Sequence, residues 1–176
     1  MRNRYLAGAC VVAALCLPAG LGSPAATEFH PPSQKSERKE TPLTKHATGT
    51  FEVKVSPQPA EEGVGDPAVG RMSIDKQFHG DLEAASRGQM LAFRTEVEGS
   101  AGYVAMERVV GKLGGRSGSF VLQHSGTMTR GTPQLSVTVV PDSGTGELAG
   151  LSGKMTIDIA GGKHSYEFEY TLAEPR

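Results

Sequence analysis

The stretch that decides the fold is residues 99–131, GSAGYVAMERVVGKLGGRSGSFVLQHSGTMTRG. Within it Ser119–Met128 alternates: Phe120, Leu122, His124 and Met128 share one face, and the residues between them share the other. A helix would instead repeat its apolar residues every three to four positions. Tyr103–Val110 is a second extended run, and Gly114-Gly115 supply the positive φ that a tight connection needs. The stretch therefore predicts a hairpin of two long strands.

The rest of the chain after residue 45 shows short extended runs separated by glycine-rich turns, and it contains no amphipathic helical pattern of useful length. These runs predict six further strands, at Gly49–Ser56, Arg71–Phe78, Leu82–Thr95 (broken by Gly88), Gln134–Val140, Glu147–Ile159 and His164–Leu172. Eight antiparallel strands close into a barrel whose interior either fills with side chains or holds one small ligand. We therefore predict an all-β, eight-stranded antiparallel barrel over residues 46–173.

The polarity of the two faces of a predicted strand changes from one part of the chain to another. The first two and the last two strands are polar on one face, as a solvated wall requires, whereas the third to sixth are apolar on both. An apolar outer face needs a cover, and no helix is available to provide it. The sequence therefore predicts a homo-oligomer.

The first 25 residues have the layout of a secretory signal peptide: Arg2 and Arg4, the apolar run Tyr5–Leu17, and then small residues up to Ala25. The apolar run is too short to span a bilayer comfortably. We expect cleavage after Ala25 and a secreted or extracytoplasmic protein without membrane insertion; the alternative is a retained anchor. A lipoprotein fits poorly, because neither Cys10 nor Cys16 follows a small-residue box at the right place.

Residues 26–45 are rich in Pro, Ser, Lys and Glu, and so predict a disordered linker, either a tether or a passive tail. Cleavage at Ala25 would remove both cysteines, and with them any disulfide, thiolate nucleophile or cysteine metal ligand. The net charge of −1 would become −3 through the loss of Arg2 and Arg4. No basic stripe with interleaved aromatics occurs, which argues against nucleic acid as a partner.

From Ala47 to Leu172 the chain resembles the uncharacterised family called domain of unknown function 3224. The resemblance is carried by ATGTFEVK, KQFHGDLEA, GSAGYVAMERVVGKLGGRSGSFVLQH, VVPDSGTGELAGLSGKMTID and YEFEYTL. It implies an antiparallel barrel of the allene oxide cyclase type, often oligomeric and with an apolar cavity. It implies no activity, because none is established for the family, and a shared fold does not transfer one.

Three polar residues each share a strand face with apolar neighbours, and they are candidates to orient a ligand if that face is the lumen. His124 could act as an acid or base, or be a hydrogen-bonded core histidine. Lys76 could pair with a ligand carboxylate or with Glu107, or extend to the barrel rim. Glu107 must be paired or protonated if it is buried; its candidate partners are Lys76, Arg94 and Arg116, and the alternative is a purely structural ion pair.

Three aromatic residues complete the predicted ligand-binding set of Lys76, Tyr103, Glu107, Phe120, His124 and Tyr166. Tyr103 and Tyr166 have amphipathic rings suited to a pocket wall, although the default explanation for both is core filling. No cofactor or metal is predicted: His79, Asp81 and His164 lack metal-ligand spacing, and turn chemistry explains Gly80-Asp81. The serines have no nucleophile-elbow motif, and the glycine-rich runs open no helix that would bind phosphate.

These observations favour a secreted, oligomeric barrel that binds a small, mostly apolar molecule in its lumen. Two other classes of protein stay open. One is a cofactor-free cyclase or isomerase that holds a reactive ligand in a folded pose away from water. The other is a barrel with a filled lumen that serves as a structural module. The sequence does not decide whether a reaction is catalysed.

Overall fold

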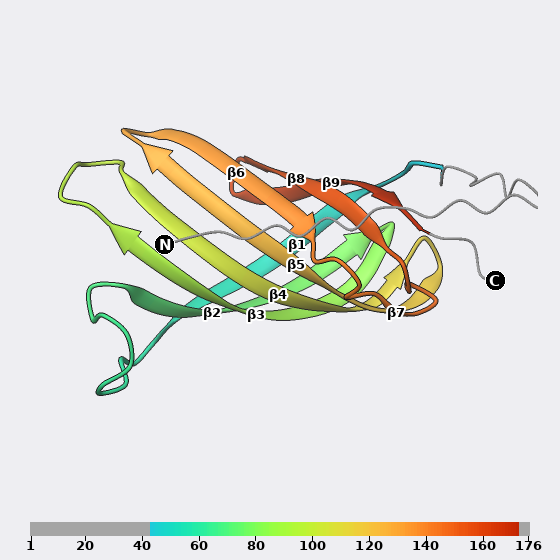
Figure 1. The fold of residues 1–176 in the computed structure, drawn as a ribbon. Coiled ribbons are helices and arrows are strands. Elements are labelled where there is room, and N and C mark those ends of the chain that lie inside the picture. Colours follow the sequence, from blue (N-terminus) through green and yellow to red (C-terminus); the bar gives the residue numbers. More distant parts are fainter. Residues whose placement is uncertain (1–42, 173–176) are drawn as a thin grey trace, which may run out of the picture. The chain divides into compact units, whose positions relative to one another are not determined.

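The structure, a computed structural model, describes residues 43–172, and long antiparallel strands joined by turns and loops make up most of this range (Figure 1). The strands are β1 (Lys45–Gln58), β2 (Gly70–Gly80), β3 (Leu82–Arg94), β4 (Ala101–Leu113), β5 (Arg116–Thr129), β6 (Thr132–Val139), β7 (Thr145–Gly146), β8 (Ser152–Ala160) and β9 (Lys163–Thr171). The predicted hairpin is β4 and β5, joined at Gly114 and Gly115, whose φ angles are 56° and 82°.

The eight long strands close into a barrel, as predicted. Their order around the sheet is β4-β3-β2-β1-β9-β8-β6-β5, and pairing of β4 with β5 completes the ring. Most neighbours are joined over their full length; β3 and β4, for example, pair from Leu82↔Leu113 to Arg94↔Ala101. β6 and β8 share only the pair Thr138↔Lys154, so the wall is weakest there. Within residues 43–172 no helix is long and apolar enough to cross a membrane.

One end of the barrel is packed solid. The segment after β6 forms the short strand β7, which pairs with β5, and then a run of turns that places Leu148 and Leu151 across this end. The core gathers here and in the middle of the barrel: Ala47, Phe51, Phe78, Leu82, Ala84, Val109, Leu113, Phe120, Leu122, Val137, Val139, Leu148, Leu151, Met155, Tyr166, Phe168, Tyr170 and Leu172. Ligand access through this end would require unpacking of the core.

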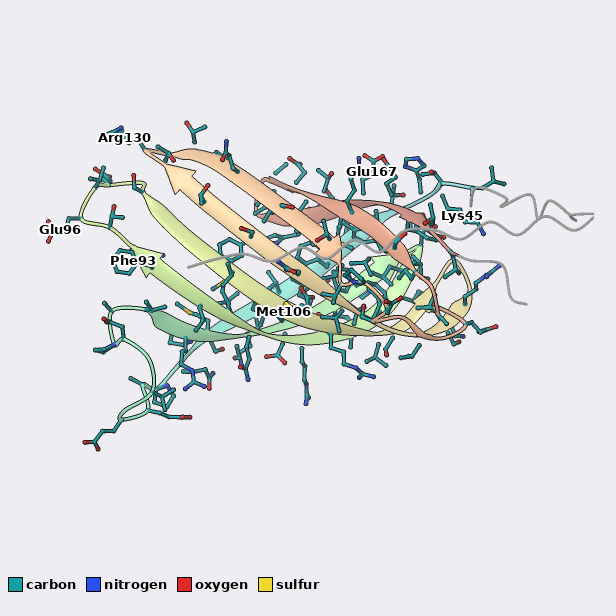
Figure 2. The ribbon with its side chains drawn as sticks, viewed as in Figure 1. Lys45, Phe93, Glu96, Met106, Arg130 and Glu167 are labelled. Atoms are coloured by element: carbon teal, nitrogen blue, oxygen red, sulfur yellow. The ribbon has the colours of Figure 1, made fainter. Side chains whose placement is uncertain are left out.

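The opposite end is open. It carries the loops after β1, β3, β5 and β8, and Glu96 and Arg130 in Figure 2 mark two of these loops, whereas Lys45 lies toward the packed end. Side chains that face inward near this end are partly exposed to solvent. The large apolar residues among them are Val55 (47% exposed), Met128 (42%), Leu135 (44%) and Ile159 (64%). The barrel therefore has the form of a cup with an apolar mouth.

The outward faces of β3 and β4 carry five large apolar side chains that are each about half exposed. We call them the outer patch: Leu91, Phe93, Val104, Met106 and Val110. The register places Leu91 directly opposite Val104, so the patch is continuous across the two strands. Figure 2 shows Phe93 and Met106 of this patch.

Three expectations from the sequence need correction. Residues 147–151 form turns instead of strand, because Gly146 and Gly150 adopt positive φ and Leu148 N donates to Thr145 O. β3 runs unbroken through Gly88. The outward faces of β5 and β6 are mostly polar, so the apolar outer face is narrower than expected and confined to the outer patch.

The predicted leader, residues 1–25, and nearly all of the predicted linker, residues 26–45, lie outside the described residues. β1 begins at Lys45, which pairs with Tyr170 of β9. β9, the last strand, ends at Thr171.

Candidate functional site

Glu107 lies in the middle of β4, points into the barrel and is completely buried. Gly88 of β3 lies directly opposite it in the register. A Cβ atom at Gly88 would lie 2.7 Å from the carbonyl oxygen of Met106 and 3.1 Å from the Cβ of Glu107. The missing side chain at position 88 therefore lets β3 and β4 approach closely beside this carboxylate.

Three side chains from three other strands surround the Glu107 carboxylate. Lys76 Nζ of β2 donates to Oε2 over 2.7 Å, and the Ser86 hydroxyl of β3 donates to Oε1. His124 Nε2 of β5 lies 2.9 Å from Oε2, within ion-pair distance, although the contact does not meet the geometric criteria for a hydrogen bond. We call these four residues the buried ionic cluster. Each of its members is less than 10% exposed.

The strand register explains why these four side chains meet. Ser86 lies opposite Lys76 on the neighbouring strand, and His124 lies one inward-facing position from the partner of Glu107, Leu122. Inward-facing residues on adjacent antiparallel strands come within about 4.5–5.5 Å, or 7–8 Å on the diagonal, which long polar side chains can span. The sequence reasoning named three of the four members and missed Ser86. Its alternation with Leu82 and Ala84 on the same strand is the signal that would have found it.

Lys76 is held inside the barrel and does not extend to the rim. Its Nζ lies 4.9 Å from the ring centroid of Phe51 and 5.6 Å from that of Phe78. Aromatic faces attract a cation, so these rings replace part of the hydration that burial removes. Of the three cations considered as partners for Glu107, the structure pairs it with Lys76.

Burial alone would raise the pKa of Glu107, because a carboxylate loses its hydration in the barrel interior. The contacts with His124, Lys76 and Ser86 outweigh that effect and lower the pKa to about 2. The group is therefore a carboxylate at neutral pH. A permanently ionised, fully engaged carboxylate is better suited to positioning its neighbours than to accepting a proton.

Tyr103 lies on the same inward face of β4, two inward-facing positions nearer the mouth. Its ring covers Gly126 of β5, where any Cβ would collide with it. Its hydroxyl makes no hydrogen bond with the described part of the chain. Burial and the negative charge of Glu107 both raise the pKa of Tyr103, so its hydroxyl keeps its proton and remains a donor.

The other two predicted wall residues lie deeper, in the packed core. Phe120 stacks on Phe168 with ring centroids 5.8 Å apart. Tyr166 uses its hydroxyl to accept from the Leu82 N–H over 2.9 Å and to donate to the His79 carbonyl over 3.2 Å. The structure thus brings Lys76, Glu107 and His124 into contact. It places Tyr103 nearer the mouth and Phe120 and Tyr166 in the packed core.

The residues weighed as metal ligands have other contacts. His79 Nε2 lies 2.7 Å from Glu52 Oε2 on the surface, Asp81 accepts from the Thr48 N–H over 2.8 Å, and the His164 ring packs 5.1 Å from the ring of Phe51. Among residues 43–172, no three His, Cys, Asp or Glu side chains come together in a way that would hold a metal ion.

A hollow of about 1020 Å³ runs along β2, β3, β4 and β5. Consecutive residues on each strand line it, so both faces of this part of the sheet contribute and only a share of the volume belongs to the lumen. Its inward-facing lining is Met72, Ile74, Gly88, Met90, Ala105, Glu107 and His124. Of the buried ionic cluster, Glu107 and His124 belong to this lining, whereas Lys76 and Ser86 do not.

The fold and the site together define a class: an antiparallel β-barrel, open at one end, with an ionic cluster beneath an apolar mouth. Residues 47–170 match the model of the family described as "Protein of unknown function (DUF3224)". The chain belongs to this family.

A solved structure from the same family, a protein with unknown function from Shewanella oneidensis MR-1, is similar to this chain at 52% sequence identity and a TM-score of 0.68. The alignment covers 75% of this chain and all of that one. A comparison with curated proteins found no match.

Proposed function

We propose that this protein is an exported barrel that binds a small, mostly apolar molecule in its lumen. The observation that carries the proposal is the combination of a packed end with an open, apolar end. A barrel that serves only as a scaffold has no reason to leave large apolar side chains exposed at its mouth, since their exposure costs free energy. A ligand that covers these apolar side chains on binding would recover that free energy.

The buried ionic cluster supports the same proposal. Burying a Lys–Glu pair costs desolvation energy, and replacing such a pair with apolar residues is often neutral or stabilising. Four polar groups at the floor of an otherwise apolar cup therefore fit a role in orienting a ligand better than a role in stability. Ligand sites commonly combine apolar walls with a few convergent polar groups.

Native mass spectrometry of the protein purified from its own host tests the proposal. We expect a co-purifying molecule that is released on unfolding. The matched variants are Ala105→Phe, which places a ring inside the cup beside His124, and Val104→Phe, which adds the same ring to the outer surface. Ala105→Phe should abolish retention and Val104→Phe should not. Bare protein from the host, or equal retention by both variants, would contradict binding in the lumen.

A further inference from the structure

The outer patch lies between two groups of opposite charge on the outside of β3 and β4. Toward the packed end lie Arg87 and Arg108, which are exposed and directly opposite each other in the register. Toward the mouth lies the loop that joins the two strands, in which Glu96 and Glu98 are exposed. Between these groups lie four of the five members of the patch: Leu91, Phe93, Val104 and Met106. In Figure 2, Met106, Phe93 and Glu96 follow one another toward the mouth.

The arginine pair is unfavourable in an isolated barrel, because like charges directly opposite each other on adjacent strands destabilise a sheet. Asp75 of β2 lies opposite Arg87, but its Oδ1 is 3.6 Å from Arg87 Nε, and the Arg87 side chain is 92% exposed. Arg108 donates to the neutral Ser119 hydroxyl over 2.9 Å. These contacts provide one carboxylate for two guanidinium groups, so carboxylates from a partner would offset the excess positive charge.

The loop at the mouth carries carboxylates that the barrel does not use. The side chains of Glu96 and Glu98 make no hydrogen bond or ion pair with the rest of residues 43–172. Backbone hydrogen bonds hold the loop in a defined turn, from Thr95 N to Ser100 O over 3.1 Å and from Ser100 N to Val97 O over 3.0 Å. The loop therefore presents two free carboxylates at the end of the outer patch.

The surface between the two charged groups has the composition of a protein interface. No charged residue of β3, β4 or β5 faces outward between the arginine pair and the loop. Depletion of charge, with phenylalanine, methionine and arginine enriched, distinguishes interfaces from the rest of a protein surface. The hollow along β2–β5 includes this surface in its outward-facing lining, through Gln89, Leu91, Val104, Met106, Val121 and Gln123.

We propose that the outer patch is the contact face of a dimer of this chain, in which Arg87 and Arg108 of each subunit bind the Glu96 and Glu98 carboxylates of the other. Charge complementarity selects a second copy as the occupant, because one face carries both charged groups at opposite ends of an apolar surface. In a two-fold contact, each group meets its complement twice. The dimer does not depend on occupancy of the lumen.

The spacing along the strands fits this arrangement. Arg87 lies four residues from Leu91 toward the packed end, and Glu96 lies five residues from it toward the mouth. At about 3.3 Å per residue these separations are about 13 Å and at most about 16 Å. A two-fold axis in the contact plane that crosses the strands at the Leu91–Val104 pair therefore places each arginine pair against the acidic loop of the partner. An axis parallel to the strands would instead oppose arginine to arginine.

Light scattering on the protein purified from its own host tests the proposal with two charge-reversal variants. The basic-end variant is Arg87→Glu/Arg108→Glu, and the acidic-end variant is Glu96→Arg/Glu98→Arg. We expect the unaltered protein to be a dimer and each variant alone to dimerise at least about a hundredfold more weakly, because like charges then meet at both contacts. An equimolar mixture of the two variants should restore a dimer that contains one copy of each.

The matched control is Lys54→Glu/Lys154→Glu, which reverses two exposed charges on β1 and β8, outside the face. This control should remain dimeric. A monomeric unaltered protein would overturn the proposal, as would dimers of unchanged affinity in both charge-reversal variants. A mixture that stays monomeric, although circular dichroism shows both variants folded, would contradict the pairing of the arginines with the acidic loop.

Discussion

Replacement of Glu107 by Gln should destabilise the barrel strongly, because it leaves the Lys76 ammonium buried without its counter-charge. The Nζ–Oε2 distance is 2.7 Å, and the two side chains are 6% and 0% exposed. At an effective dielectric constant of about 20, the attraction between the two charges is about 6 kcal/mol. Breaking a buried pair by removing one partner typically costs about 3–5 kcal/mol, which is the loss we expect.

The assay is urea unfolding at pH 7, with the free energy of unfolding extrapolated to water. The matched control is Asp75→Asn, one residue from Lys76, which removes an exposed carboxylate 3.6 Å from Arg87. An exposed ion pair is worth about 0–1 kcal/mol, so the control should lose little. The double variant Lys76→Met/Glu107→Gln should be more stable than Glu107→Gln alone, since it no longer contains an unpaired buried cation.

Two results would refute this reasoning. One is a loss for Glu107→Gln as small as that of Asp75→Asn, which would mean that water reaches Lys76 and solvates it. The other is strict additivity in the double variant, which would mean that the two charges do not interact.

Three further predictions follow from the same structure. The pKa of Glu107 is about 2 in the barrel, against an ordinary value of 4.5. This difference contributes about 3 kcal/mol to the free energy of unfolding above pH 4.5, and the contribution is lost as the pH falls toward 2. In urea unfolding, the free energy of unfolding of Glu107→Gln should therefore change less over that pH range than that of the unaltered protein. Gly88→Ala should lower the melting temperature by several degrees, because its Cβ would lie 2.7 Å from the Met106 carbonyl oxygen. The control Gly102→Ala should not, because its Cβ would have no neighbour closer than 3.8 Å. Equal melting temperatures of the two variants would contradict the close approach of β3 and β4. If a second copy of the chain covers the outer patch, light scattering should show an oligomer that Met106→Glu dissociates, and an unchanged mass would exclude the patch as the interface.

The fold was predictable because its signal is local. Alternation in residues 119–128 and the glycine pair 114–115 act within one hairpin, and the pleat of a strand forces neighbouring side chains to opposite faces. The turn at residues 147–151 was not predictable in the same way. Leu148 and Leu151 are apolar, as strand residues often are, so their sequence does not distinguish a strand from a turn. They close the packed end because their side chains are buried in the core there.

The sequence by itself favoured an inward direction for Lys76 and His124, since each alternates with polar residues on its own strand. The direction of Glu107 was decided by the tertiary structure, because the strand of Glu107 has apolar residues on both faces. Only the tertiary structure decided that these three residues meet, that Ser86 joins them, and that Phe120 and Tyr166 belong to the packed end instead. The physical reason is that the direction in which a side chain points depends on its own strand. Contact between side chains of different strands depends on register and strand order. These are set by pairing between segments far apart in the chain.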